Sequence, residues 1–265
     1  MGLYVEIKQR SIIKKALPPS IILGKALATR DDIRSGCTDI CAYLPEHIGR
    51  GIYISWNRKS ASVSLPMFAL PEEIKEFYNV VDRISKYWSC TLETDDGETT
   101  LSDFAAGLDD NLEFNRKATE KFLTDISQGE ITTFPCALCD LTPGAQEARR
   151  FAGSPEALYN WLHERQSMDV HFANCGFSVR GGGVRGRFAF TEDVPTVFPC
   201  NPKRLRSDCA EFDVNIVSMT ERAVIGSLTY DEFISRISRD KISRFDEKSV
   251  LVEAHSHKEL EALLK

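Results

Sequence analysis

The sequence has no long apolar run. Its first residues, MGLYVEIKQRSIIKK, lack the apolar segment of an export signal, and no later stretch approaches the roughly 18–20 apolar residues of a membrane helix. Glu6 stands where a myristoylation signal beginning at Gly2 has serine or threonine. These absences predict a soluble, cytoplasmic protein without a membrane partner.

Catalytic signatures are also missing. The sequence contains no G-x-S-x-G nucleophile turn, no H-E-x-x-H pair and no calcium-binding EF-hand loop. The segment around Gly24 and Lys25 lacks the upstream glycine of a P-loop and has Ala26 where that loop places serine or threonine. His255 and His257 flank the expected start of the last helix, and we interpret them as neighbours of its cap. No residue is predicted to be catalytic, and a non-enzymatic role is favoured.

Disulfides and cofactors are not expected. Eight cysteines in a chain without an export signal predict reduced thiols, and a chain of 265 residues buries enough apolar surface to fold without metal or disulfide. Cys136 and Cys139 form a C-x-x-C pair, which is typical of redox centres or of half a zinc site. Pro143 and Gly144 leave little room for a helix after the pair, and no second ligand pair has the usual spacing. Two structural thiols are favoured, and metal binding by Cys136 and Cys139 is the alternative.

No excess of positive charge covers the chain as a whole. Its formal net charge is −6, which argues against general affinity for nucleic acid. Residues 91–130 hold eleven acidic and three basic side chains, whereas residues 180–206 hold six basic and two acidic ones. We interpret both runs as solvated faces, which can complement each other in the fold.

The apolar pattern predicts strands and helices in alternation. Alternating residues indicate strands at 50–56 and 61–67, helical spacing indicates a helix at 70–88, and a strand at 89–97 ends in an Asp-Gly turn. The same order recurs later with strands at 211–219, 222–229 and 248–255, and with helices that begin at the capping boxes Thr229-x-x-Glu232 and Ser256-x-x-Glu259. We therefore expect an α+β fold, with antiparallel or mixed sheets covered by helices and two β-β-α-β-type units at about residues 50–97 and 211–255.

A low-complexity linker is absent, so the division into domains depends on weaker signals. Further helices are expected at 101–127 and 143–165, and the turn-prone segment SQGEITT separates them. This segment predicts an N-terminal α+β lobe at 1–130 and a C-terminal α+β lobe at 131–265. A single compact domain is the alternative.

The segment SVRGGGVRGRFAF matches the dinucleotide-binding pattern G-x-G-x-x-G at Gly181, Gly183 and Gly186. That pattern requires a helix after the glycines, because the pyrophosphate rests on the helix N-terminus. The residues that follow are aromatic or β-branched and include two prolines, so a strand is expected there. A protein-kinase glycine loop does join two strands, but no H-R-D or D-F-G motif follows. The segment therefore predicts a β-hairpin with a glycine-rich tip.

Three arginines surround this hairpin tip. Arg180, Arg185 and Arg187 carry guanidinium groups that match phosphate geometry, although a purely structural role is favoured. Since every catalytic template fails, we expect a non-catalytic binding or interaction protein with an unidentified protein partner and an undefined oligomeric state. The alternative is binding of a phosphate-bearing ligand, nucleotide or RNA, with or without enzymatic activity, at Arg180, Gly181, Gly183, Arg185 and Arg187.

Overall fold

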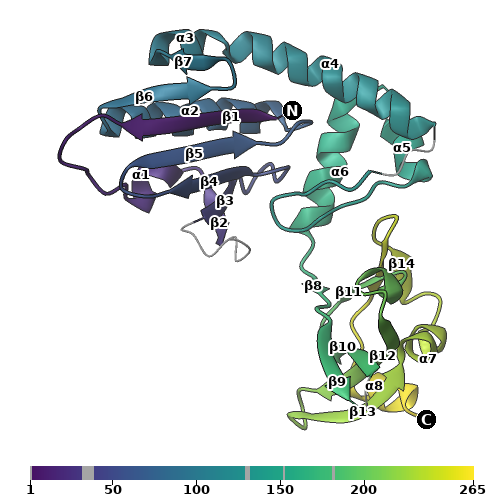
Figure 1. The fold of residues 1–265 in the computed structure, drawn as a ribbon. Coiled ribbons are helices and arrows are strands. Elements are labelled where there is room, and N and C mark those ends of the chain that lie inside the picture. The colour runs from purple at the N-terminus through teal and green to yellow at the C-terminus, as the bar shows by residue number, and fades with distance from the viewer. Residues whose placement is uncertain (1, 32–38, 129–131, 152, 181–182) are drawn as a thin grey trace. The chain divides into compact units, whose positions relative to one another are not determined.

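The chain divides into two compact units, Met1–Ser167 and Met168–Lys265. The structure is a computed structural model that describes residues 2–31, 39–128, 132–151, 153–180 and 183–265 (Figure 1). The sequence predicted lobes at 1–130 and 131–265, whereas the compact units meet between Ser167 and Met168. Residues 129–131, at the predicted boundary, lie outside the described part. The segment after them belongs to the first unit because Gln166 donates hydrogen bonds to the Gly49 carbonyl, at 2.9 Å, and accepts one from the Leu138 N–H, at 2.8 Å.

The first unit is built on an antiparallel sheet with the strand order β2-β3-β4-β5-β1-β6-β7. Its strands are β1 (Leu3–Gln9), β2 (Ala28–Asp31), β3 (Asp39–Tyr43), β4 (Ile52–Trp56), β5 (Ser60–Leu65), β6 (Cys90–Thr94) and β7 (Gly97–Thr99). Its helices are α1 (Pro19–Leu23), α2 (Pro71–Tyr87), α3 (Leu101–Ala106), α4 (Leu108–Ser127), α5 (Ala145–Phe151) and α6 (Pro155–Ser167).

The β-β-α-β order predicted for residues 50–97 is confirmed by β4, β5, α2 and β6. Helix α2 begins with a proline at its first position and packs against β1 and β5 (Figure 1). Its residues Ile74, Phe77, Val81 and Ile84 are fully buried, as the helical spacing of the apolar residues requires. Strand β1, which is absent from that predicted unit, lies between β5 and β6 and completes the sheet.

The second unit contains two sheets, with strand orders β13-β12-β10-β9 and β14-β15-β11-β8. The pairs β10–β12 and β8–β11 are parallel and the others are antiparallel, so both sheets are mixed. The strands are β8 (His171–Phe172), β9 (Gly176–Arg180), β10 (Gly183–Thr191), β11 (Thr196–Pro199), β12 (Cys209–Ser218), β13 (Ala223–Thr229), β14 (Ile242–Arg244) and β15 (Ser249–Val252). The helices are η1 (Pro202–Arg204), α7 (Tyr230–Arg236) and α8 (His257–Leu263).

Buried aromatic rings join these two sheets into one core. Phe190, Phe198 and Phe233 come from β10, β11 and α7, and their ring centroids lie 5.2–6.0 Å apart. Aromatic pairs at this spacing add to the free energy gained by burial alone. The second unit therefore has a hydrophobic core of its own.

The element order predicted for residues 211–255 is present, but its last strand joins a different sheet. Strands β12 and β13 pair and α7 follows them, whereas β15 pairs with β11 and β14. Both predicted capping boxes are formed, at Thr229 and Ser256. The α+β class with antiparallel and mixed sheets is confirmed. Among the described residues, no helix has the length and apolar character to cross a membrane.

Candidate functional site

Strands β9 and β10 are the two arms of the glycine-rich segment. They pair antiparallel, with Ser178 opposite Arg185 and Gly176 opposite Arg187. Gly181 lies outside the described residues, and so does the side chain of Arg180. Gly183 begins β10 and is exposed.

Gly186 is glycine because aromatic packing requires it. A Cβ atom built there would lie 2.5 Å from Cδ1 of Phe212 and 2.9 Å from Sγ of Cys175, both closer than real Cβ contacts. Phe177 is paired opposite Gly186 on β9, and Phe212 is its partner on β12. The third glycine of the G-x-G-x-x-G pattern thus serves the packing of two strands.

Each arginine of β10 has a carboxylate as its neighbour on β12. In the parallel register Arg185 is paired with Glu211, and Arg187 with Asp213. Arg185 forms an ion pair with Glu211 and lies 4.0 Å from the Asp213 carboxylate. Arg187 is half-buried, and none of the described carboxylates lies within 4.0 Å of it. The positive charge that the sequence displays is therefore partly balanced within the sheet.

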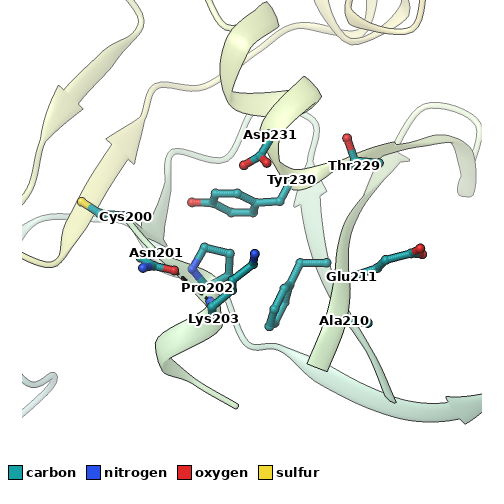
Figure 2. Close-up of a pocket in the computed structure, with 10 residues that line it drawn as sticks. Cys200, Asn201, Pro202, Lys203, Ala210, Glu211, Thr229, Tyr230 and Asp231 are labelled. Carbon is teal, nitrogen blue, oxygen red and sulfur yellow. Dashed lines mark hydrogen bonds between the residues drawn. The ribbon is translucent and has the colours of Figure 1, made fainter. Parts of the chain in front are cut away.

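A depression of about 590 Å³ lies beside this sheet in the second unit (Figure 2). Its walls come from the segment between β11 and β12, which includes η1, from the start of β12, and from the β13–α7 junction. The residues that line it are Cys200, Asn201, Pro202, Lys203, Ala210, Glu211, Phe212, Thr229, Tyr230 and Asp231.

Local capping fixes the two ends of the depression. The Asn201 side chain accepts a hydrogen bond from the Lys203 N–H at 3.1 Å and begins η1. Thr229 accepts one from the Glu232 N–H at 3.3 Å and begins α7. Figure 2 shows the Lys203 amine directed toward the space below the Tyr230 ring, whereas the Glu211 carboxylate points away.

The polar groups of the depression are suited to binding rather than to nucleophilic attack. The Tyr230 hydroxyl donates to the Pro199 carbonyl, and burial raises the pKa of this phenol, so it stays protonated. Burial also raises the pKa of the Cys200 thiol, with the Asp246 carboxylate as the next cause. A thiol with a raised pKa is a poor nucleophile at neutral pH. The depression also offers the Lys203 amine, the Asp231 carboxylate and the rings of Phe212 and Tyr230.

The comparisons with known proteins give a family but no function. Residues 5–263 match the family described as a domain of unknown function, DUF4299. The chain belongs to the DUF4299 family. No curated protein and no solved structure matches it. Because the match spans the limit at Ser167 and Met168, the DUF4299 module includes both compact units.

In this DUF4299 chain, Cys136 and Cys139 lie between two residues that form an isolated bridge, Phe134 and Leu141. Cys136 is buried, and burial raises the pKa of its thiol, which disfavours the thiolate that a metal requires. Within the described ranges, one group of three or more His, Cys, Asp or Glu side chains has its ligand atoms within 4.8 Å of one another. Neither cysteine belongs to it. Two structural thiols stay the prediction, with metal binding by the pair as the alternative.

Two sets of residues were missed in the sequence. The first set lines the depression, where Asn201 and Lys203 lie near Tyr230 and Asp231. The features of the sequence that could have indicated it are the helix caps at Asn201 and Thr229. The second set is the group of possible metal ligands, Glu221, His257 and Glu261, of which only His257 was singled out, as a neighbour of a helix cap. Its signal was the four-residue spacing of His257 and Glu261, which places both side chains on one helix face.

Proposed function

We propose that this DUF4299 protein is a non-catalytic binding protein, and that its second unit binds a polypeptide partner at the depression and at the apolar side chains beside it. The observation that carries the proposal is the combination of exposed apolar side chains with an arginine, Arg185, whose charge is already shared with the Glu211 and Asp213 carboxylates. Cytoplasmic location is part of the same proposal.

The apolar surface beside the depression supports a protein partner. Phe177 is 40% exposed, and its ring centroid lies 6.5 Å from that of Phe212, which lines the depression. Leu205, which ends η1, is 51% exposed. Exposed aromatic side chains beside a pocket are typical of the energetically dominant residues of protein interfaces.

The polar groups of the depression also suit a polypeptide. A peptide backbone offers both N–H donors and carbonyl acceptors, and these match the Asp231 carboxylate and the Lys203 amine. A polyanion would match Lys203 alone and would be repelled by Asp231. The mixture of charges thus favours a peptide over a polyphosphate.

The second candidate is a phosphate-bearing ligand, nucleotide or RNA at Arg180, Arg185 and Arg187, with or without enzymatic activity. It is favoured by Arg187, because no described carboxylate lies within the 4.0 Å ion-pair distance of its guanidinium. It ranks second because a phosphate at Arg185 would have to compete with Glu211 and Asp213.

The test compares proteins that copurify with the tagged full chain and its variants, measured by quantitative mass spectrometry. Phe177→Ser and Lys203→Glu change the proposed surface. Val224→Ser is the matched control, since Val224 is 57% exposed on β13, at the other edge of the same sheet. We expect at least one protein that is retained by the wild type and the control and depleted at least about tenfold by both surface variants. Equal recovery with all four chains would contradict the proposal.

A thermal-shift experiment tests the second candidate. Nucleotides, polyphosphate and short RNA are added to the full chain at low salt, where electrostatic binding is strongest. The proposal predicts no rise in the unfolding midpoint. A rise that Arg187→Ala abolishes and Phe177→Ser leaves intact would establish phosphate binding instead.

A further inference from the structure

Three side chains converge in the second unit at a place that includes no residue of the depression. His257 begins α8, Glu261 lies one helical turn later, and Glu221 comes from the turn between β12 and β13. His257 Nε2 lies 3.5 Å from Oε1 of Glu221 and 3.7 Å from Oε1 of Glu261. The ligand atoms of all three lie within 4.8 Å of one another.

The hydrogen bonds of Ser218 identify which ring nitrogen of His257 carries a proton. The Ser218 hydroxyl donates its one proton to the Glu192 carboxylate at 3.0 Å, and its oxygen accepts from the Glu221 N–H at 3.0 Å. Ser218 Oγ also lies 3.0 Å from Nδ1 of His257. Because the hydroxyl proton is already used, Nδ1–H must be the donor to Ser218. In the neutral imidazole, Nε2 then has a free lone pair.

The groups behind His257 hold its ring in this orientation. The Glu192 carboxylate is buried and accepts hydrogen bonds from the Thr220 hydroxyl at 2.7 Å and the Thr220 N–H at 3.0 Å. The resulting carboxylate–hydroxyl–imidazole chain resembles, with one added hydroxyl, the carboxylate–histidine pairs that orient metal-binding imidazoles. The chain directs Nε2 toward Glu221 and Glu261.

Three lone pairs that face one another are stabilised by a cation between them. Both separations are longer than the distance of about 2.7–3.2 Å in a direct N–H···O hydrogen bond, so neither carboxylate is hydrogen-bonded to Nε2. Ligand atoms held about 2.1 Å from a tetrahedral metal ion lie about 3.4 Å apart, which is close to the observed 3.5 and 3.7 Å. The Glu221 and Glu261 side chains are 53% and 51% exposed, so an ion can enter from solvent.

We propose that His257 Nε2, Glu221 and Glu261 bind one divalent transition-metal ion. One nitrogen and two carboxylate oxygens suit Zn²⁺, Mn²⁺ and related ions, and solvent supplies the remaining ligands. This site goes beyond the proposed partner binding and does not depend on it.

The test is a titration of chelator-treated full-length protein with Mn²⁺, in which electron paramagnetic resonance measures the free ion. Mn²⁺ is the probe because it prefers nitrogen and oxygen ligands to the thiolates of the cysteines. We expect one bound Mn²⁺ per wild-type chain. Glu261→Gln and Glu221→Gln should weaken binding at least about tenfold, since each removes an ionised ligand.

Matched controls separate loss of the site from loss of the fold. His171→Ala removes an exposed histidine on β8 of the same unit and should bind Mn²⁺ as the wild type does. The two glutamine variants change exposed side chains and should keep the metal-free melting temperature of the wild type. Phe177→Ser should also keep Mn²⁺ binding, so failure of the partner proposal leaves this result unaffected. Absence of stoichiometric binding, or equal affinity in wild type and both glutamine variants, would overturn the site.

Discussion

At the scale of single residues, Gly186 belongs to a nucleotide-binding sequence pattern but has a packing role. It completes a nucleotide-binding pattern, yet the Phe212 ring and the Cys175 sulfur occupy the space that a side chain would need. Phe212 is also part of the aromatic core, where its ring stacks on Phe188 at 6.2 Å. Glycine is required here by packing rather than by contact with an anion.

This packing predicts the effect of a single added methyl group. Gly186→Ala should lower the free energy of unfolding by about 1–3 kcal/mol, because the Phe212 ring must move. Gly176→Ala on the partner strand is the control, since the nearest atom to its new Cβ is 3.9 Å away. Urea unfolding of both variants measures the difference. Equal stability of the two variants would show that Phe212 moves at little cost.

At the scale of elements, helix α7 depends on its capping box. The Glu232 carboxylate accepts hydrogen bonds from the Thr229 hydroxyl at 2.8 Å and from the Thr229 N–H at 3.1 Å. These two hydrogen bonds lower the pKa of Glu232 below its ordinary value of 4.5, and the bond from the hydroxyl has the larger effect. Helix α7 begins directly after β13, and its first two residues, Tyr230 and Asp231, line the depression. The capping box therefore also positions these two side chains.

The lowered pKa predicts a pH-dependent contribution to stability. A carboxyl group whose pKa is lower in the folded state stabilises the fold fully above its unfolded value, and this contribution is lost as the pH falls through the folded value. Glu232→Gln should therefore be less stable than the wild type at pH 7, and the gap should narrow below about pH 4.5. Urea unfolding midpoints at pH 7 and pH 3 measure the gap. Ser235→Ala is the control: it removes a hydrogen bond to the Glu232 carbonyl but no charge, so its difference from the wild type should be the same at both pH values. A gap of equal size at both pH values would contradict this role.

At the scale of the whole molecule, both proposed sites belong to the second unit. The depression lies between residues 200 and 231, and the proposed metal ligands lie between 221 and 261. The unit has its own aromatic core, which includes Phe188, Phe190, Phe198 and Phe233. The first unit has a separate core formed by its sheet and α2.

A separate core predicts that residues 168–265 fold alone. A chain of this size with a continuous core is in the range of independent domains. The fragment should give a dispersed amide spectrum and a single cooperative thermal transition. An unfolded fragment, in preparations where the full chain is folded, would show that the second unit requires the first.

Much of the fold could be predicted because it depends on near neighbours in the chain. Helix α2 was predicted from the spacing of residues such as Ile74 and Phe77, and it lies within the predicted range. The capping boxes at Thr229 and Ser256 involve residues three positions apart, so the sequence shows both partners together. Arg180, Arg185 and Arg187 could also be recognised, because they lie close together in the glycine-rich segment.

The partners of those residues are distant in the chain, and only the tertiary structure decided them. Arg185 is paired with Glu211 because β10 and β12 lie side by side in parallel, and β15 joins β11 rather than β12. His257 is near Glu221 because α8 packs beside the turn after β12. The sequence by itself determined the periodicity of the apolar residues and the helix caps, because both depend on residues that lie within one or two helical turns of each other. Strand partners and charge pairs depend on which apolar faces are buried together, and that is a property of the whole unit.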